Sequence, residues 1–106
     1  MPKSTALLMD AIGRQRLTVS NTALTLTIPS DTNGRPANFA LMTVETNPVR
    51  WTIDGTTPVA VTTGHKLNAG DALELRGQDN LASFKVIRDG AADAALEVTY
   101  GRLKEN

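Results

Sequence analysis

The amino-acid sequence predicts an all-β protein, an antiparallel sandwich or jelly-roll-like barrel of about eight short strands with a short N-terminal helix or arm. Apolar and polar residues alternate along most of the chain after Arg16, and clusters of Gly, Pro, Asn and Asp separate the alternating runs. No long helical stretch lies between these runs, so the crossover helices of a parallel sheet are missing. The length of 106 residues fits one domain, which we place at residues 15–106 behind an arm or helix at residues 1–14.

The N-terminal segment is the one part of the sequence with a helical pattern. In residues 4–13, Ser4 is a suitable N-cap and Gly13 can end a helix. A helix this short is marginal in water, so its apolar face has to dock on the domain or on another subunit. We therefore predict an interaction surface made of the four residues on that face: Leu7, Leu8, Ala11 and Ile12. The alternative is a loosely packed arm, because chain ends are often poorly ordered.

Each predicted strand is a run of four to eight residues between two turn signals. The clearest alternation is in residues 22–28, where two leucines and Ile28 share one face and the threonines at positions 25 and 27 share the other. The other predicted strands are residues 17–20, 39–46, 49–54, 59–62, 72–76, 82–88 and 94–100. The turn signals that separate them are rich in residues that accept positive φ or preset a turn: Asn33-Gly34, Asn47-Pro48, Asp54-Gly55, Gly70-Asp71, Gln78-Asp79-Asn80 and Asp89-Gly90.

The same alternation predicts which residues form the core. Trp51 and Phe84 are the expected aromatic anchors, and Tyr100 is expected to keep its hydroxyl near the rim. The full predicted core is Leu24, Leu26, Ile28, Met42, Val44, Trp51, Ile53, Val59, Val61, Leu73, Leu75, Phe84, Val86, Leu96 and Val98.

Composition argues against several functional classes. Eleven basic and eleven acidic residues leave no net charge, so nothing favours nucleic acid or an acidic membrane as a partner. The chain has no cysteine, which excludes disulfides and cysteine-ligated zinc. The apolar run at residues 6–9 is too short for a signal-peptide core or a membrane span, so we expect a protein that is made in the cytoplasm.

Candidate catalytic and metal-binding residues are few. His65 is the only histidine, and no cluster with metal-ligand spacing surrounds it. None of the four serines lies in a Gly-x-Ser-x-Gly motif. Six aspartates lie at predicted turns or strand edges, where their own backbone explains them better than a calcium loop does: Asp31, Asp54, Asp71, Asp79, Asp89 and Asp93. We therefore predict no enzymatic activity, no cofactor and no metal ion.

One series of turns and strands resembles a known family. Residues 49–58 read Val-Arg-Trp-Thr-Ile-Asp-Gly-Thr-Thr-Pro, and residues 63–71 contain Gly64, Leu67 and Gly70-Asp71. Residues 84–87 read Phe-Lys-Val-Ile, and residues 94–100 read Ala-Ala-Leu-Glu-Val-Thr-Tyr. This series, within residues 39–101, resembles a family of small tailed-bacteriophage virion proteins. Its matching positions are turn and core positions, so the resemblance implies a structural part of the particle, and a capsid decoration or cement protein fits best.

The function expected from this resemblance is that of a non-enzymatic virion protein that binds the assembled shell and stabilises it. Its partner would be the major capsid protein or another virion protein, or a second copy in a homo-oligomer, with no nucleic acid and no membrane. The protein would be made in the host cytoplasm and end in the virion. The alternative is a ligand- or carbohydrate-recognition β-sandwich of a tail fibre or cell-surface protein, for which Trp51 and Tyr100 are the candidate aromatic contacts.

Overall fold

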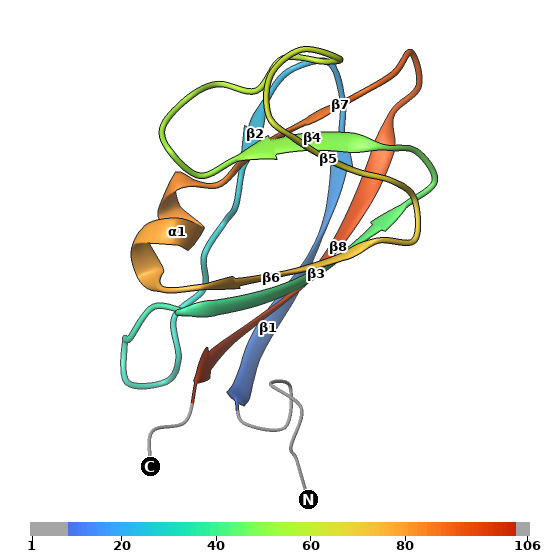
Figure 1. Ribbon diagram of the computed structural model, residues 1–106. Helices are drawn as coiled ribbons and strands as arrows, with labels where there is room; N and C mark the ends of the chain where they lie inside the picture. The colour runs from blue at the N-terminus through green and yellow to red at the C-terminus, as the bar shows by residue number, and fades with distance from the viewer. Residues whose placement is uncertain (1–8, 104–106) are drawn as a thin grey trace, which may run out of the picture.

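Two antiparallel sheets of four strands each pack face to face (Figure 1). The computed structural model describes residues 9–103. The first sheet has the order β1-β8-β3-β6, made of β1 (Met9–Val19), β8 (Ala94–Leu103), β3 (Phe39–Glu45) and β6 (Ala72–Arg76). The second has the order β2-β7-β4-β5, made of β2 (Leu24–Thr25), β7 (Lys85–Arg88), β4 (Val49–Thr52) and β5 (His65–Leu67). The predicted all-β sandwich is confirmed.

The two longest strands, β1 and β8, pair along their whole length. Their register runs from Met9 opposite Leu103 to Val19 opposite Ala94, with a β-bulge between Ala11 and Gly13. The helix predicted over residues 4–13 is therefore wrong for residues 9–13, which belong to β1, and β1 also continues across our domain boundary at residue 14. Pairing with β8 satisfies backbone groups in this segment, whereas a helix this short has little stability of its own. Residues 4–8 of the predicted helix lie outside the described residues.

Three further predictions need correction. The strand predicted over residues 22–28 is ladder-paired only at β2, two residues at the edge of the second sheet. Residues 59–62 form a turn with a single bridge, between Val59 and Thr63, and not a strand. The run 82–88 is divided between a short helix, α1 (Gln78–Ser83), and β7, since Gly77 at φ 96° starts a helical turn that buries Leu81.

The core lies between the sheets. The predicted core residues Leu26, Met42, Val44, Leu75, Phe84, Val86, Leu96 and Val98 are buried, and Leu24, Ile28, Trp51, Ile53 and Leu73 pack against them while partly exposed. The sequence prediction missed Leu17, Val19, Ala37, Ala40, Val49, Leu81, Ala94 and Tyr100, which are also buried in this cluster. It was wrong for Val59 and Val61, whose exposed fractions are 50% and 69%.

The sandwich has two distinct ends. At one end β1 begins and β8 ends, and at the other lie the connections β1–β2, β4–β5 and β7–β8 (Figure 1). We call the second of these the loop end. Within the described range, α1 has only six residues, and no helix is long and apolar enough to cross a membrane.

Candidate functional site: the valine tip and its anchor

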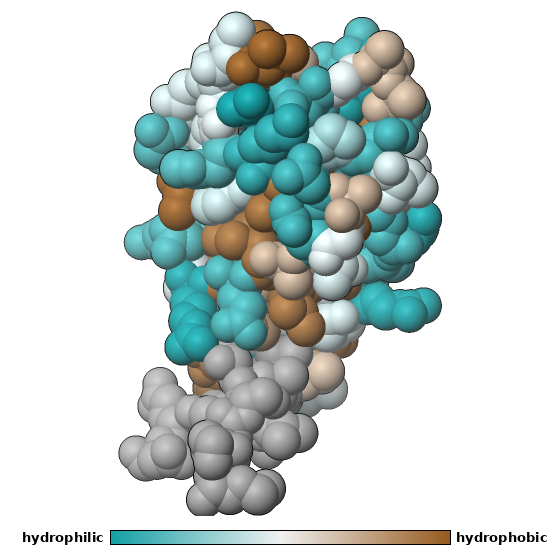
Figure 2. Space-filling view, turned by 45° about the vertical axis from the view of Figure 1, so that its right-hand side comes forward, coloured by the Kyte–Doolittle hydropathy of each residue, from teal (hydrophilic) through white to brown (hydrophobic). Residues whose placement is uncertain are grey.

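The connection between β4 and β5, residues 53–64, carries the exposed apolar residues of the loop end. Val59 and Val61 are the exposed large hydrophobic residues of the part of the chain that the structure describes. Figure 2 shows an apolar group at this end of the molecule among hydrophilic neighbours. Residues 55–64 read Gly-Thr-Thr-Pro-Val-Ala-Val-Thr-Thr-Gly and contain no charged side chain. We call residues 59–63 the valine tip.

The backbone of the valine tip is a tight turn under strain. The Val59 N–H donates to the Thr63 carbonyl at 3.0 Å, and the Thr63 N–H donates back to the Val59 carbonyl at 3.0 Å. Between them, Val61 has a φ of 71°. Left-handed backbone is disfavoured for residues with a Cβ, and most strongly for β-branched ones, so this conformation costs on the order of 1–3 kcal/mol. Surrounding contacts must hold it in place.

The contact that holds Val61 is a buried carboxylate. The side chain of Asp89, 5% exposed, accepts a hydrogen bond from the Val61 N–H at 2.6 Å and another from Nε of Arg50 at 2.9 Å, both on Oδ1. Nζ of Lys66 lies 3.5 Å from the other oxygen, Oδ2. Arg50 also donates through Nη1 to the Gly64 carbonyl at 3.0 Å. One carboxylate and one guanidinium thus join the tip to β4 and to the end of β7.

The electrostatics of this anchor favour the ionised carboxylate. Burial raises the pKa of the Asp89 carboxyl, but hydrogen bonds from the Val61 amide and the Arg50 guanidinium, with the charges of Arg50 and Lys66, outweigh burial and hold the pKa below its usual value. At neutral pH Asp89 is therefore a charged acceptor, which makes its hydrogen bonds stronger than those of a neutral group.

The residues on either side of the valine tip are fixed by packing. Pro58 is fully buried immediately before the tip. Gly64, immediately after it, has a φ of 112°, and a Cβ at this position would lie 2.9 Å from the Trp51 carbonyl oxygen. Only glycine fits such a close approach to the β4 backbone. Packing at Pro58 and Gly64 thus holds the two ends of the valine tip, and the hydrogen bond from the Val61 amide to Asp89 holds its middle.

An aromatic group lies beside this loop. The Trp51 ring is 4.8 Å from the ring of His65 and 6.0 Å from that of Phe84, measured between centroids. His65 was predicted to lie in a loop, but it begins β5 and pairs with Trp51. Phe84 is buried as predicted, whereas Trp51 is only partly buried and its Nε1 is enclosed without a hydrogen-bond partner. The Trp51 indole therefore already has two aromatic contacts within the protein, the rings of His65 and Phe84.

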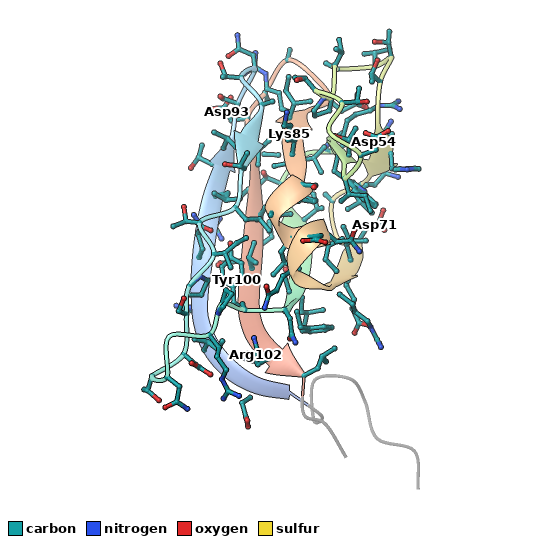
Figure 3. The ribbon with its side chains drawn as sticks, turned by 90° about the vertical axis from the view of Figure 1, so that its left-hand side faces the viewer. Asp54, Asp71, Lys85, Asp93, Tyr100 and Arg102 are labelled. Carbon is teal, nitrogen blue, oxygen red and sulfur yellow. The ribbon has the colours of Figure 1, made fainter. Side chains whose placement is uncertain are left out.

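A shallow hollow of about 440 Å³ also adjoins the loop. Its lining includes Asp54, Thr56 and His65. Asp54 accepts a hydrogen bond from the Thr56 N–H at 3.0 Å, and hydrogen bonds from the amide and hydroxyl of Thr56 lower the pKa of its carboxyl. In Figure 3 Asp54 lies at the loop end, as Asp93 does, while Arg102 lies at the opposite end. Asp54 and Thr56, which line this hollow, therefore hydrogen-bond to each other and stabilise the turn that contains them.

The other aspartates behave mostly as predicted. Asp31 accepts from the backbone amides of its own turn, and so does Asp71. Asp79 instead lies in the first turn of α1, and Asp93 pairs with Arg88 at 2.6 Å. Among residues 9–103, no group of three or more His, Cys, Asp or Glu side chains is placed to hold a metal ion. Asp89 is the exception that sequence reasoning missed, since nothing local separates it from its exposed counterparts.

Tyr100 belongs to the core and not to a binding surface. Its hydroxyl donates to Oε1 of Gln15 on β1 at 2.6 Å, and the residue as a whole is buried. Burial raises the pKa of the Tyr100 hydroxyl to about 12, against a smaller opposing effect of the Thr27 backbone. The ring therefore offers no exposed face to a ligand.

Of the four residues predicted as an interaction surface, Ala11 and Ile12 lie in β1 and not on a helix face. Leu7 and Leu8 lie outside the described residues. Ala11 is exposed, and Ile12 lies at the β-bulge of β1 and packs partly buried against the core. Ala11 and Ile12 are at the end of the sandwich opposite the valine tip (Figure 1).

In comparisons with known proteins, no family model, curated protein or solved structure matches this chain.

Proposed function

We propose that this protein is a non-enzymatic structural protein of a bacteriophage virion, a decoration protein that binds the assembled capsid shell and stabilises it. Its partner is the major capsid protein or another virion protein. It is made in the host cytoplasm and functions in the particle. Because such a protein binds the assembled state and not free subunits, it stabilises assembly by mass action.

The observation that carries this proposal is the valine tip. It presents two exposed valines on an uncharged loop, in a strained conformation that a buried ion pair maintains. Two exposed valines on a restrained loop are suited to a contact with another protein, and such a contact would give the strained backbone of Val61 a use.

The residues that resemble phage virion proteins support the proposal in a second way. Asp54 and Gly55 form a turn, Gly64 packs against the β4 backbone, and Phe84 fills the core. Some of the positions that carry the resemblance therefore build and hold the β4–β5 loop, next to the valine tip, while others lie in β7 and β8.

The carbohydrate-binding alternative has less support. Sugar-binding sites in β-sandwiches need exposed aromatic faces beside polar groups. Trp51 lies between His65 and Phe84, and Tyr100 is buried with its hydroxyl on Gln15. Tyr100 is therefore excluded as a sugar contact, and Trp51, partly buried, already has two aromatic rings of the protein beside it.

The test is quantitative mass spectrometry of purified particles of the source virus. We expect this protein in intact virions at a fixed ratio to the major capsid protein, and we expect particles without it to lose DNA at a lower temperature. If the protein is absent from intact virions, or is present only at trace levels that vary between preparations, the proposal is wrong.

A further inference from the structure

We propose that copies of this protein associate head to tail, with β1 of one copy pairing antiparallel with β6 of the next, so that the first sheet continues from molecule to molecule. The occupant of each open sheet edge is thus a second copy of this chain. This inference goes beyond the proposed function and does not depend on it, because it concerns contacts between copies only. The contact joins two different surfaces, so its repetition gives a closed ring or an open filament.

The first sheet has two open edges, β1 and β6. These strands have eleven and five residues, whereas the edge strands of the second sheet, β2 and β5, have two and three. Within residues 9–103, neither β1 nor β6 makes a backbone–backbone hydrogen bond outside its ladder with β8 or β3. The unpaired amide and carbonyl groups of such an edge are a template for another strand.

The outward backbone groups of β6 follow from its pairing with β3. The Asp71 carbonyl accepts a hydrogen bond from a β3 amide at 2.9 Å, so Asp71 and every second residue after it face β3. Ala72 and Glu74 therefore point their amide and carbonyl groups away from the sheet. The Arg76 carbonyl is already occupied, since it accepts from the Asn80 side chain at 2.8 Å. Ala72 and Glu74 are thus the part of this edge that a new strand can use.

The same alternation, followed through the β3–β8 and β8–β1 ladders, gives the outward backbone groups of β1. Residues of β3 that do not face β6 face β8, and residues of β8 that do not face β3 face β1. Arg14 and Arg16 are left with their amide and carbonyl groups pointing outward. Neighbouring strands in this sheet are all antiparallel, so β1 and β6 run in opposite directions and can pair antiparallel between copies.

The rows of residues across the sheet fix the register of this contact. One row runs from edge to edge as Arg14, Thr99, Leu41 and Glu74. Copies placed side by side with no stagger along the strands therefore bring Arg14 of one copy opposite Glu74 of the next. Arg16 of the same strand then lies opposite Ala72, so both pairs can exchange backbone hydrogen bonds.

Charge complementarity supports a second copy as the occupant. Arg14 is exposed and makes no ion pair with the residues that the structure describes. The Glu74 side chain is 41% exposed and meets Arg76 of its own strand through one oxygen, at 3.4 Å. Opposite charges directly across a sheet stabilise the pairing, and the sheet already contains one such pair, Arg16 and Glu97 at 3.3 Å.

The same charges disfavour contacts between identical edges. Two β1 strands paired around Gln15 set Arg14 of each copy opposite Arg16 of the other, and two β6 strands paired around Glu74 set two carboxylates opposite each other. Like charges directly opposite are destabilising. The two edges therefore favour each other over themselves.

Sedimentation velocity of the purified full-length protein measures this association. We expect the average mass of the wild type to rise with concentration up to about 1 mM. Arg14→Glu sets like charges at the contact and should weaken association about tenfold, while Arg14→Glu/Glu74→Arg restores an opposite pair and should return to within about threefold of the wild type. Both variants should keep the wild-type melting temperature, because both side chains are exposed. A wild type that stays monomeric throughout this range, or a double variant that does not recover, overturns the proposal.

Cysteine cross-linking identifies the two surfaces. The chain has no cysteine, so each introduced thiol is unique. Thr18 and Ala72 are exposed and would be diagonal neighbours across the contact, next to the ion pair but not part of it. With a short bis-maleimide, T18C/A72C should give a ladder of dimers, trimers and longer products, and a mixture of the single variants T18C and A72C should stop at dimers. Dimers in either single variant alone, or no ladder in the double variant, would show that the contact is not head to tail.

Discussion

Replacing Asp89 by Asn should destabilise this protein. Asn keeps an oxygen that can accept the Val61 amide, so the tip retains its hydrogen bond in weakened form. What it loses is the negative charge that faces Arg50 at 2.9 Å and Lys66 at 3.5 Å. Asp89→Asn thus removes the negative charge of this side chain while keeping its size and shape.

The magnitude follows from the exposure of the partners. Removing one member of a fully buried ion pair costs about 3–5 kcal/mol. The side chain of Arg50 is 20% exposed and that of Lys66 is 46% exposed, so both can regain part of their hydration. We therefore expect Asp89→Asn to cost about 2 kcal/mol, which corresponds to a drop of roughly 8–12 °C in melting temperature for a domain of this size. Asp89→Ala also leaves the Val61 amide without its acceptor, and should cost about 3–4 kcal/mol.

Urea denaturation followed by fluorescence measures these losses, and Asp93→Asn is the matched control. Asp93 also pairs with an arginine, Arg88 at 2.6 Å, but its side chain is 50% exposed. An exposed pair of this kind contributes at most about 1 kcal/mol. A loss for Asp89→Asn below about 0.5 kcal/mol, or no larger than that of Asp93→Asn, would refute the view that the buried charge holds the loop.

The same anchor predicts how stability depends on pH. The pKa of Asp89 is lower in the folded protein than in the unfolded chain, where it is about 3.9. Its contribution is therefore complete above the unfolded pKa and is lost as the pH falls through the lower folded pKa. The stability difference between wild type and Asp89→Asn should be constant from pH 7 to about pH 5 and shrink below about pH 4. A difference that persists undiminished at pH 2 would contradict this.

Four other measurements test the structure. Val61→Asn should raise stability by about 1 kcal/mol in urea melts, because Asn tolerates the left-handed backbone, and should weaken particle binding at the same time. Tyr100, the only tyrosine, should remain protonated in absorbance titrations until near pH 12, and its contribution to stability should be present below pH 10 and disappear as the pH rises through about 12. Trp51, the only tryptophan, should emit at shorter wavelength than free indole and ignore added sugars, whereas a red-shifted, sugar-sensitive signal would favour the carbohydrate alternative. Deleting residues 1–13 should lower the melting temperature by several degrees because it removes part of β1, and deletion of residues 1–8, which keeps all of β1, is its control.

Sequence reasoning succeeded where local pattern and environment agree. The strand predicted over residues 72–76 matches β6, and the one predicted over residues 39–46 matches β3 to within one residue. In both, alternation reflects one face turned to the core, and turn residues close both ends. The N-terminal half of β1 could not be found this way, because its partner is the far end of β8, about ninety residues later.

The candidate site illustrates the same limit. Val59 and Val61 are two residues apart and look like one face of a strand, which is why they were predicted as core. The backbone of the turn that exposes them is held at Val61 by Asp89, which lies 28 residues further along the chain. The available local signal was Pro58, which argues against a central strand, within the uncharged stretch between Gly55 and Gly64. Which aspartate is buried depends on the assembled sandwich and has no local signature.

β8 can complete its sheet only after residues 94–103 have been synthesised, because Ala94–Leu103 follows the other described strands in sequence and inserts between β1 and β3. Until then a nascent chain holds β1 and β3 with their facing edges unpaired, a state that is prone to aggregation. Pairing of this sheet therefore cannot proceed strand by strand along the chain, and a chain that lacks residues 94–103 would leave β1 and β3 with open edges. The yield of folded molecules should therefore depend on how quickly β8 is captured between β1 and β3.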